Sequence, residues 1–186
     1  LLEQRLDTAK QSERPSILMN LAVLSARELS NSTQAAQFAE AALKEEPTYV
    51  PAVVLLSELA FADHNWIEVD QLIERLGDID GYSLTAEDLF RRAVAALHRG
   101  VPGRAISSLR IIDMMGAYFP GMWSAFVEGY LQIEDYAALT PFVDKMITHE
   151  LNDEGTPSLL QRCVNADGLI LSDLALREVD KRGLVP

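Results

Sequence analysis

The feature that most constrains this chain is a pattern of apolar and small residues that recurs about every 34 residues. In the stretch that begins at Pro120, large side chains occupy positions 4, 7 and 11, which hold Trp123, Phe126 and Tyr130. Residues three and four apart share one face of a helix, so these aromatic side chains would lie together. The spacing therefore predicts a helix whose aromatic face packs in the protein core.

Two other stretches, beginning at Val50 and Ala86, repeat this spacing, and an earlier one follows it with a one-residue slip. Position 8 is small in three of them, where it holds Ala22, Ser57 and Ala93, so that two helices can approach closely. Strand-like alternation is absent, and Pro and Gly separate amphipathic stretches, which predicts an all-α chain. The expected helices span 1–11, 15–29, 33–46, 50–63, 66–79, 86–99, 103–115, 120–133, 137–150 and 158–181, the last broken near Gly168.

Local signals mark several helix ends. Pro47 cannot continue a helix and is expected to end one. Thr85, followed by Glu87 and Asp88, is a favourable N-terminal cap for the next helix. The stretch 31–33 (Asn-Ser-Thr) lies where a capping turn is needed, although it also matches the acceptor sequence for N-glycosylation. The resulting short turns are typical of helices that lie antiparallel to their neighbours in sequence.

The recurring pattern resembles the tetratricopeptide repeat (TPR), a helical hairpin of 34 residues. The resemblance implies an all-α fold, an α-solenoid of antiparallel hairpins that forms a right-handed superhelix. The chain departs from the pattern at Arg92, Val127 and Leu139. Pro141 either lies inside a helix or marks a late start that Thr140 caps. We expect one domain over 1–182, made of the end of an upstream repeat (1–14), repeats at 15–49, 50–85, 86–119 and 120–153, and capping helices at 154–182, followed by a tag-linker remnant at 183–186. Residues 158–181 could instead be the start of another repeat.

The sequence holds no arrangement of side chains that predicts catalysis. The three histidines do not lie at ligand spacing from one another or from Cys163, the single cysteine. We expect the histidines at the surface and Cys163 buried and inert. No Gly-rich phosphate loop occurs. The expectation is a protein that is not an enzyme and that uses no cofactor and no metal.

The resemblance also implies a binding surface. In TPR proteins, positions 2, 5, 6, 9, 12 and 13 of the first helix of each hairpin line a concave groove that binds peptide segments. The carboxylates at these positions favour a partner with basic groups. Co-chaperone members of the family bind a C-terminal carboxylate with a set of Lys, Asn and Arg side chains. Of that set this chain has only Arg91, so a clamp of this kind is not expected. The partner-binding groove implied for this chain comprises Asn20, Arg27, Val54, Glu58, Phe61, Glu87, Phe90, Arg91, Val94, Glu128 and Leu131.

The net charge of −12 disfavours nucleic-acid binding, because phosphate recognition needs clustered Lys and Arg. No apolar run predicts membrane insertion, and we expect a soluble fragment of a longer protein, cytoplasmic in preference to periplasmic. The leading hypothesis is a scaffold or adaptor for protein–protein interaction in a larger assembly. One alternative is a chaperone or export adaptor for a hydrophobic partner segment. Another is the regulatory domain of an enzyme whose catalytic part lies outside this sequence. The terminal helices could also mediate self-association.

Overall fold

The computed structural model of the protein describes residues 9–27 and 30–184. These ranges hold ten α-helices, one short 3-10 helix and no β-strand, so the all-α prediction is confirmed. The helix expected over 1–11 lies mostly outside the described residues. Gly168, with φ of 92°, lies between the last two helices, where the break was predicted. The helices are η1 (Gln11–Glu13), α2 (Arg14–Arg27), α3 (Ser32–Glu45), α4 (Val50–Ala62), α5 (Trp66–Gly77), α6 (Ala86–His98), α7 (Pro102–Met114), α8 (Met122–Gln132), α9 (Tyr136–Glu150), α10 (Thr156–Val164) and α11 (Asp173–Arg182).

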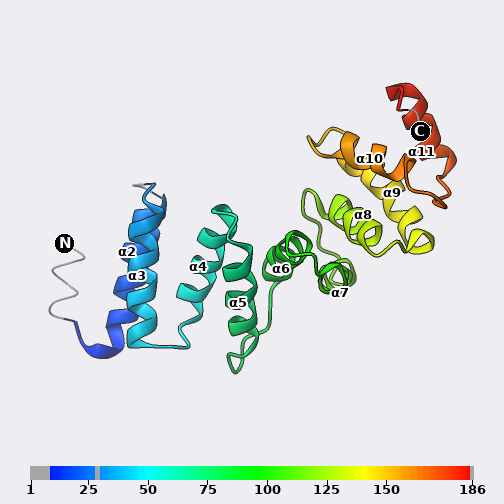
Figure 1. Ribbon diagram of the computed structural model, residues 1–186. Coiled ribbons are helices and arrows are strands. Elements are labelled where there is room, and N and C mark those ends of the chain that lie inside the picture. The colour runs from blue at the N-terminus through cyan, green and yellow to red at the C-terminus, as the bar shows by residue number, and fades with distance from the viewer. Residues whose placement is uncertain (1–8, 28–29, 185–186) are drawn as a thin grey trace. The chain divides into compact units, whose positions relative to one another are not determined.

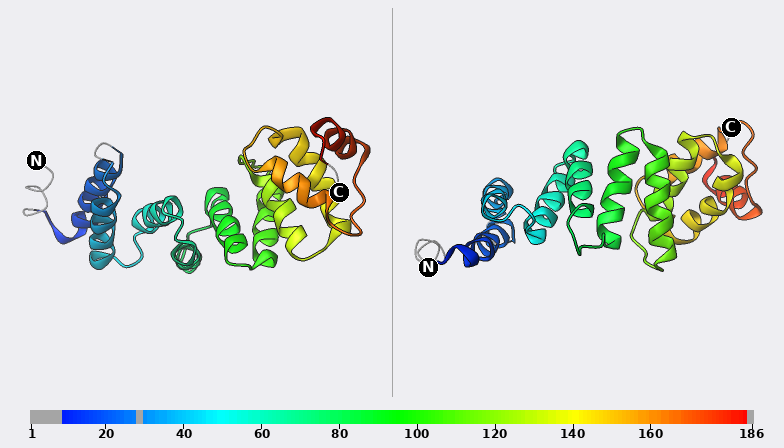
Figure 2. Two further views of the ribbon diagram at one scale, coloured as in Figure 1. Left: turned by 45° about the horizontal axis from the view of Figure 1, so that its top comes forward. Right: turned by 90° about the horizontal axis from the view of Figure 1, so that it is seen from below.

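The chain divides into two compact units, Leu1–Asp88 and Leu89–Pro186, and the division falls inside α6. In the first unit α2 packs against α3, and α4 packs against α5 (Figure 1). In the second unit α8 packs against both α7 and α9. Helix α10 contacts α8 and α9, and α11 contacts α9 (Figure 2). Packing is therefore mainly between antiparallel helices that follow one another in the sequence. The predicted repeat boundaries stay a prediction.

Small residues lie where the helices approach one another. Ala22, Ser57 and Ala93 are each 0% exposed, as the spacing predicted. The Ser57 hydroxyl donates to the carbonyl of Val54 at 2.8 Å, so its polar group is satisfied inside its own helix. Arg92, at a position that the pattern reserves for an apolar residue, is half-buried, and its Nε donates to Ser108 Oγ at 3.0 Å. The Arg92 departure from the pattern is therefore accommodated by a hydrogen bond that joins α6 to α7.

Side-chain caps fix several helix starts. The predicted cap of α6 is confirmed, because Thr85 Oγ1 accepts from the Asp88 amide at 3.2 Å and Asp88 accepts from the Thr85 amide at 2.9 Å. Asn31 caps α3 by accepting from the amide of Gln34. Asp135 caps α9, so the alternative of a late start behind Thr140 is wrong. Pro141 lies inside α9, which begins at Tyr136.

Aromatic side chains of α8 and α9 form the core of the second unit. The ring centroids of Phe126 and Phe142 are 4.2 Å apart, and those of Tyr130 and Phe142 are 5.3 Å apart. Trp123 is 8% exposed and Tyr130 is 2% exposed, which confirms that both are packing residues. The buried Tyr130 hydroxyl accepts a hydrogen bond from Arg110 Nη2 at 2.7 Å. This bond satisfies the polar end of a side chain that is otherwise surrounded by rings.

Candidate functional site

The residues of the implied groove fall into both units, and each unit contains a recess that some of them line. The recess of the first unit has a volume of about 230 Å³ and lies between α2 and α4. We call it the α2–α4 groove. Arg27, Val54 and Glu58, three of the predicted residues, lie in it, with Arg27 and Glu58 exposed. Its lining comprises Met19, Val23, Ala26, Arg27, Pro51, Val54, Leu55 and Glu58.

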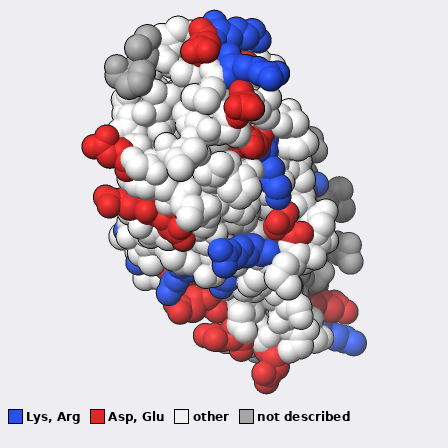
Figure 3. All heavy atoms as spheres, turned by 90° about the vertical axis from the view of Figure 1, so that its right-hand side faces the viewer, with Lys and Arg blue, Asp and Glu red and all other residues white. Residues whose placement is uncertain are grey.

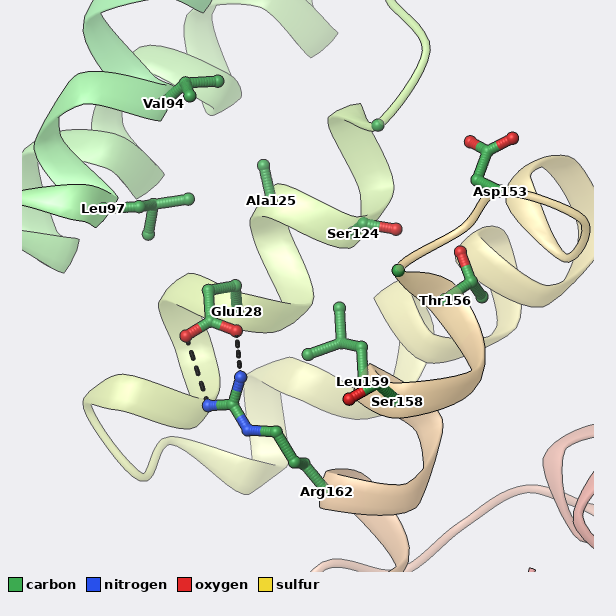
Figure 4. Close-up of a pocket in the computed structure, with 12 residues that line it drawn as sticks. Val94, Leu97, Ser124, Ala125, Glu128, Asp153, Thr156, Ser158, Leu159 and Arg162 are labelled. Atoms are coloured by element: carbon green, nitrogen blue, oxygen red, sulfur yellow. Dashed lines mark hydrogen bonds and ion pairs between the residues drawn. The ribbon is translucent and has the colours of Figure 1, made fainter. Parts of the chain in front are cut away.

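The recess of the second unit has a volume of about 420 Å³ and lies among α6, α8 and the start of α10 (Figure 4). We call it the α8–α10 groove. Its volume is within the range of roughly 300–1,000 Å³ that is usual for ligand sites. Val94 and Glu128 are the predicted residues that line it. Its lining comprises Val94, Leu97, Gly121, Ser124, Ala125, Glu128, Asp153, Gly155, Thr156, Ser158, Leu159 and Arg162.

The two grooves are lined by the same positions of the 34-residue pattern. In units counted from Val50 and Pro120, positions 2, 5, 6 and 9 supply the lining from α4 and from α8. Counting a further 34 residues from Pro120 places α10 in the same register, and the same positions again face the groove. The four positions hold Pro51, Val54, Leu55 and Glu58 on α4, the N-cap Gly121 and Ser124, Ala125 and Glu128 of α8, and the N-cap Gly155 and Ser158, Leu159 and Arg162 of α10.

An ion pair joins α8 to α10 at one end of the α8–α10 groove. Arg162 Nη1 donates to Glu128 Oε2, and Arg162 Nη2 donates to Glu128 Oε1 at 3.2 Å, so the guanidinium engages both carboxylate oxygens (Figure 4). Burial raises the pKa of Glu128, but the hydrogen bonds from Arg162 and Gln132 outweigh burial and lower it below its usual value. Glu128 is therefore ionised, and a basic partner would have to compete with Arg162 for it.

The buried carboxylate of Glu150 organises the start of α8, beside this groove. Gly121 occupies the N-cap of α8 with φ of 81° and has no side chain to cap the helix. Glu150, at the end of α9, accepts from the amides of Trp123 at 2.9 Å and Ser124 at 2.8 Å, and from the Ser124 hydroxyl at 2.7 Å. These donors compensate a carboxylate that is 1% exposed, and its charge lies at the positive end of the helix dipole.

The remaining residues of the implied groove lie outside both grooves. Phe61 packs edge to face on Trp66, with ring centroids 5.6 Å apart. Phe90 stacks on Phe119 at 5.0 Å. These two aromatic side chains therefore have packing partners inside their own units. The other four are exposed or half-buried and line neither groove: Asn20, Glu87, Arg91 and Leu131.

Sequence reasoning assigned no groove residue to α10, because residues 154–182 were interpreted as capping helices, with the start of another repeat as the alternative. The signal was available in the spacing, since Arg162 follows Glu128 by 34 residues. Asp153 was also missed, and it lies in the loop before α10, where the pattern assigns no groove position. Leu97 and Ala125 were missed although they occupy positions 12 and 6, which the family groove includes.

Cys163 is 1% exposed, and burial raises its thiol pKa to about 12. At pH 8 the fraction of reactive thiolate is then about a thousandfold lower than for a cysteine of pKa about 9. We therefore expect iodoacetamide to modify Cys163 slowly in the folded protein and rapidly in urea, as followed by mass spectrometry. The folded state holds this proton more tightly, so the free energy of unfolding should also fall as the pH rises from about 9 towards 12. Equal rates with and without urea would contradict the burial.

A third recess, of about 390 Å³, lies between α10 and α11 and is lined mainly by apolar side chains, among them Leu169, Leu176 and Val179. Ile170, close by in the sequence, is 82% exposed. Figure 3 views the side of α9 and α11, where Lys, Arg, Asp and Glu gather around an area that carries none of them. Nothing in the described ranges shows what covers this surface. The predicted self-association of terminal helices stays a prediction.

Within the described ranges, no helix has the length and apolar character needed to cross a membrane. The same ranges contain no group of three or more His, Cys, Asp and Glu side chains placed to hold a metal ion. The three histidines, His64, His98 and His149, are exposed, as expected. No protein-family model matches the chain, and neither does any curated protein or solved structure with which it was compared.

Proposed function

We propose that this chain is a TPR-like α-solenoid module that acts as a scaffold or adaptor and binds a segment of a partner protein, rather than an enzyme. The observation that carries the proposal is the recurrence of one recess at equivalent positions. Positions 2, 5, 6 and 9 line a groove from α4 in the first unit and from α8 and α10 in the second. A recess that helices build from the same positions within each unit suits a polypeptide segment, whose side chains can enter such a groove.

The chemistry of the grooves also favours a protein segment. Each combines an apolar floor with charged side chains at its rim, Arg27 and Glu58 in the first unit and Glu128, Asp153 and Arg162 in the second. A segment bound there would bury apolar side chains and keep its own polar groups paired. The charged rim favours a defined segment over the generally hydrophobic client that a chaperone or export adaptor would bind.

The proposal is tested with Ser158→Trp, which places a large ring in the α8–α10 groove. Ser158 is an exposed residue of α10, at position 5 of the unit counted from residue 154, so the substitution should leave folding intact. A displayed library of random 12-residue segments is selected on the 186-residue chain. We expect enriched segments that lose at least about tenfold in affinity for the variant, because they can no longer fill the groove.

The matched control is Ser107→Trp, the same substitution at an exposed position of α7 outside the groove. Its affinity for the segments should equal that of the parent chain. Circular dichroism and thermal unfolding establish that both variants fold. If every enriched segment binds Ser158→Trp as well as it binds the control, the α8–α10 groove is not the binding site and the proposal fails.

A further inference from the structure

The floor of the α8–α10 groove accepts an apolar side chain. Val94 and Leu97 project from α6, Ala125 lies on α8, and Leu159 lies on α10. Ala125 and Leu159 are each 8% exposed and are held in place by the helices, whereas Val94 and Leu97 are half-buried. An apolar side chain of a partner that covered them would remove further apolar surface from water. The glycines at position 2, Gly121 and Gly155, leave the rim open.

The two ends of the groove differ in charge. At one end the bidentate pair of Glu128 and Arg162 is electrically balanced. At the other end lies Asp153, whose side chain is exposed in the loop between α9 and α10 (Figure 4). Among the residues that the structure describes, no Lys or Arg forms an ion pair with Asp153. The groove therefore presents one uncompensated negative charge.

An acidic partner fits this arrangement poorly. It would have to draw Arg162 away from Glu128, whose side chain is only 26% exposed, and leave that carboxylate without its cation. A basic partner meets no such cost, because the Asp153 side chain is exposed and, among the described residues, has no cation that the partner would have to displace. The net charge of −12 further raises the local concentration of cationic segments.

We propose that the α8–α10 groove binds a protein segment that places an apolar side chain on the floor of Val94, Leu97, Ala125 and Leu159 and a nearby Lys or Arg on Asp153. This inference rests on the proposed segment-binding function and specifies its partner. The apolar contact supplies most of the affinity, because it is removed from water. The exposed ion pair selects the segment and accelerates its association.

The test uses Asp153→Lys and the segments that Ser158→Trp shows to bind in the groove. The Asp153 amide and carbonyl, which bond to Glu150 and Thr156, are unchanged by the substitution. We expect the enriched segments to carry Lys or Arg beside an apolar residue. Their affinity for Asp153→Lys should be about fivefold to tenfold weaker, since an attractive exposed pair becomes a repulsive one. Fluorescence anisotropy at low and high salt measures the change.

Glu154→Lys is the matched control, because it makes the same change in net charge one residue away, at an exposed position that does not line the groove. Its affinity should stay within about twofold of the parent. If both variants weaken binding equally, or if the enriched segments lack basic residues or are acidic, the proposed recognition by Asp153 is overturned while groove binding stands. If no enriched segment is sensitive to Ser158→Trp, the segment-binding function itself fails, and this inference fails with it.

Discussion

Trp123→Ala should lower the free energy of unfolding of the second unit by about 3–5 kcal/mol, the usual cost of truncating a large buried side chain. The indole is 8% exposed and stacks on Phe126, with centroids 5.9 Å apart, and on Phe142 at 6.2 Å. The Lys145 ammonium lies 4.0 Å from the ring centroid and adds a cation–π contact. Removing the ring leaves a cavity between α8 and α9, and the lost contacts with Phe126 and Phe142 are not replaced.

Urea unfolding followed by circular dichroism measures this loss, and hydrogen exchange locates it. Protection should fall in α8 and α9 and persist in α2 and α3, which belong to the other unit. Met114→Ala is the control, because Met114 is 87% exposed and its truncation should change stability by less than about 0.5 kcal/mol. A Trp123→Ala protein of unchanged stability that no longer binds partner segments would make Trp123 a ligand contact instead.

The helices could be predicted because their signals are local. Thr85 caps α6 with a reciprocal pair of hydrogen bonds, which the sequence motif specifies within four residues. Trp123 and Tyr130 are buried as their spacing on one helix face implied. The alternative prediction of a late start for α9 was wrong, because Asp135 accepts a hydrogen bond from the Ala138 amide at 3.2 Å and caps the helix ahead of Pro141. A local cap outweighed the proline, which the helix accommodates in its second turn.

The site could be predicted only in part, because a groove is formed by residues far apart in the sequence. The repeat positions placed Val54, Glu58, Val94 and Glu128 in the recesses that the structure contains. The pairing of Glu128 was not predicted, because no groove position was assigned to α10, although Arg162 follows Glu128 by 34 residues. Phe90 was expected in the groove, but Phe119, in the turn before α8, stacks on it. Side-chain partners of this kind depend on tertiary packing rather than on repeat position.

The cap that Glu150 provides for α8, a helix other than its own, was not predicted from the sequence. Capping motifs that can be recognised in a sequence lie within a few residues of the helix start, as Asn31 does for α3. Glu150 accepts hydrogen bonds from the amides of Trp123 and Ser124, which precede it by 27 and 26 residues. Gly121 was the available clue, because a glycine at the N-cap leaves the first amides of α8 without a local acceptor.

Glu150→Ala should accordingly lower the free energy of unfolding of the second unit by about 2–4 kcal/mol, the combined cost of a lost cap and of buried donors left without an acceptor. Glu150→Gln should lose about half as much, because one amide oxygen can still accept from Trp123 or Ser124 while the NH2 group faces a donor. Glu154→Ala removes an equal charge from an exposed position nearby and should change stability by less than about 0.5 kcal/mol. Urea unfolding of the three variants at pH 7 distinguishes the specific cap from a general effect of charge. Equal stabilities of Glu150→Ala and Glu154→Ala would mean that the hydrogen bonds at the start of α8 contribute nothing beyond what water supplies.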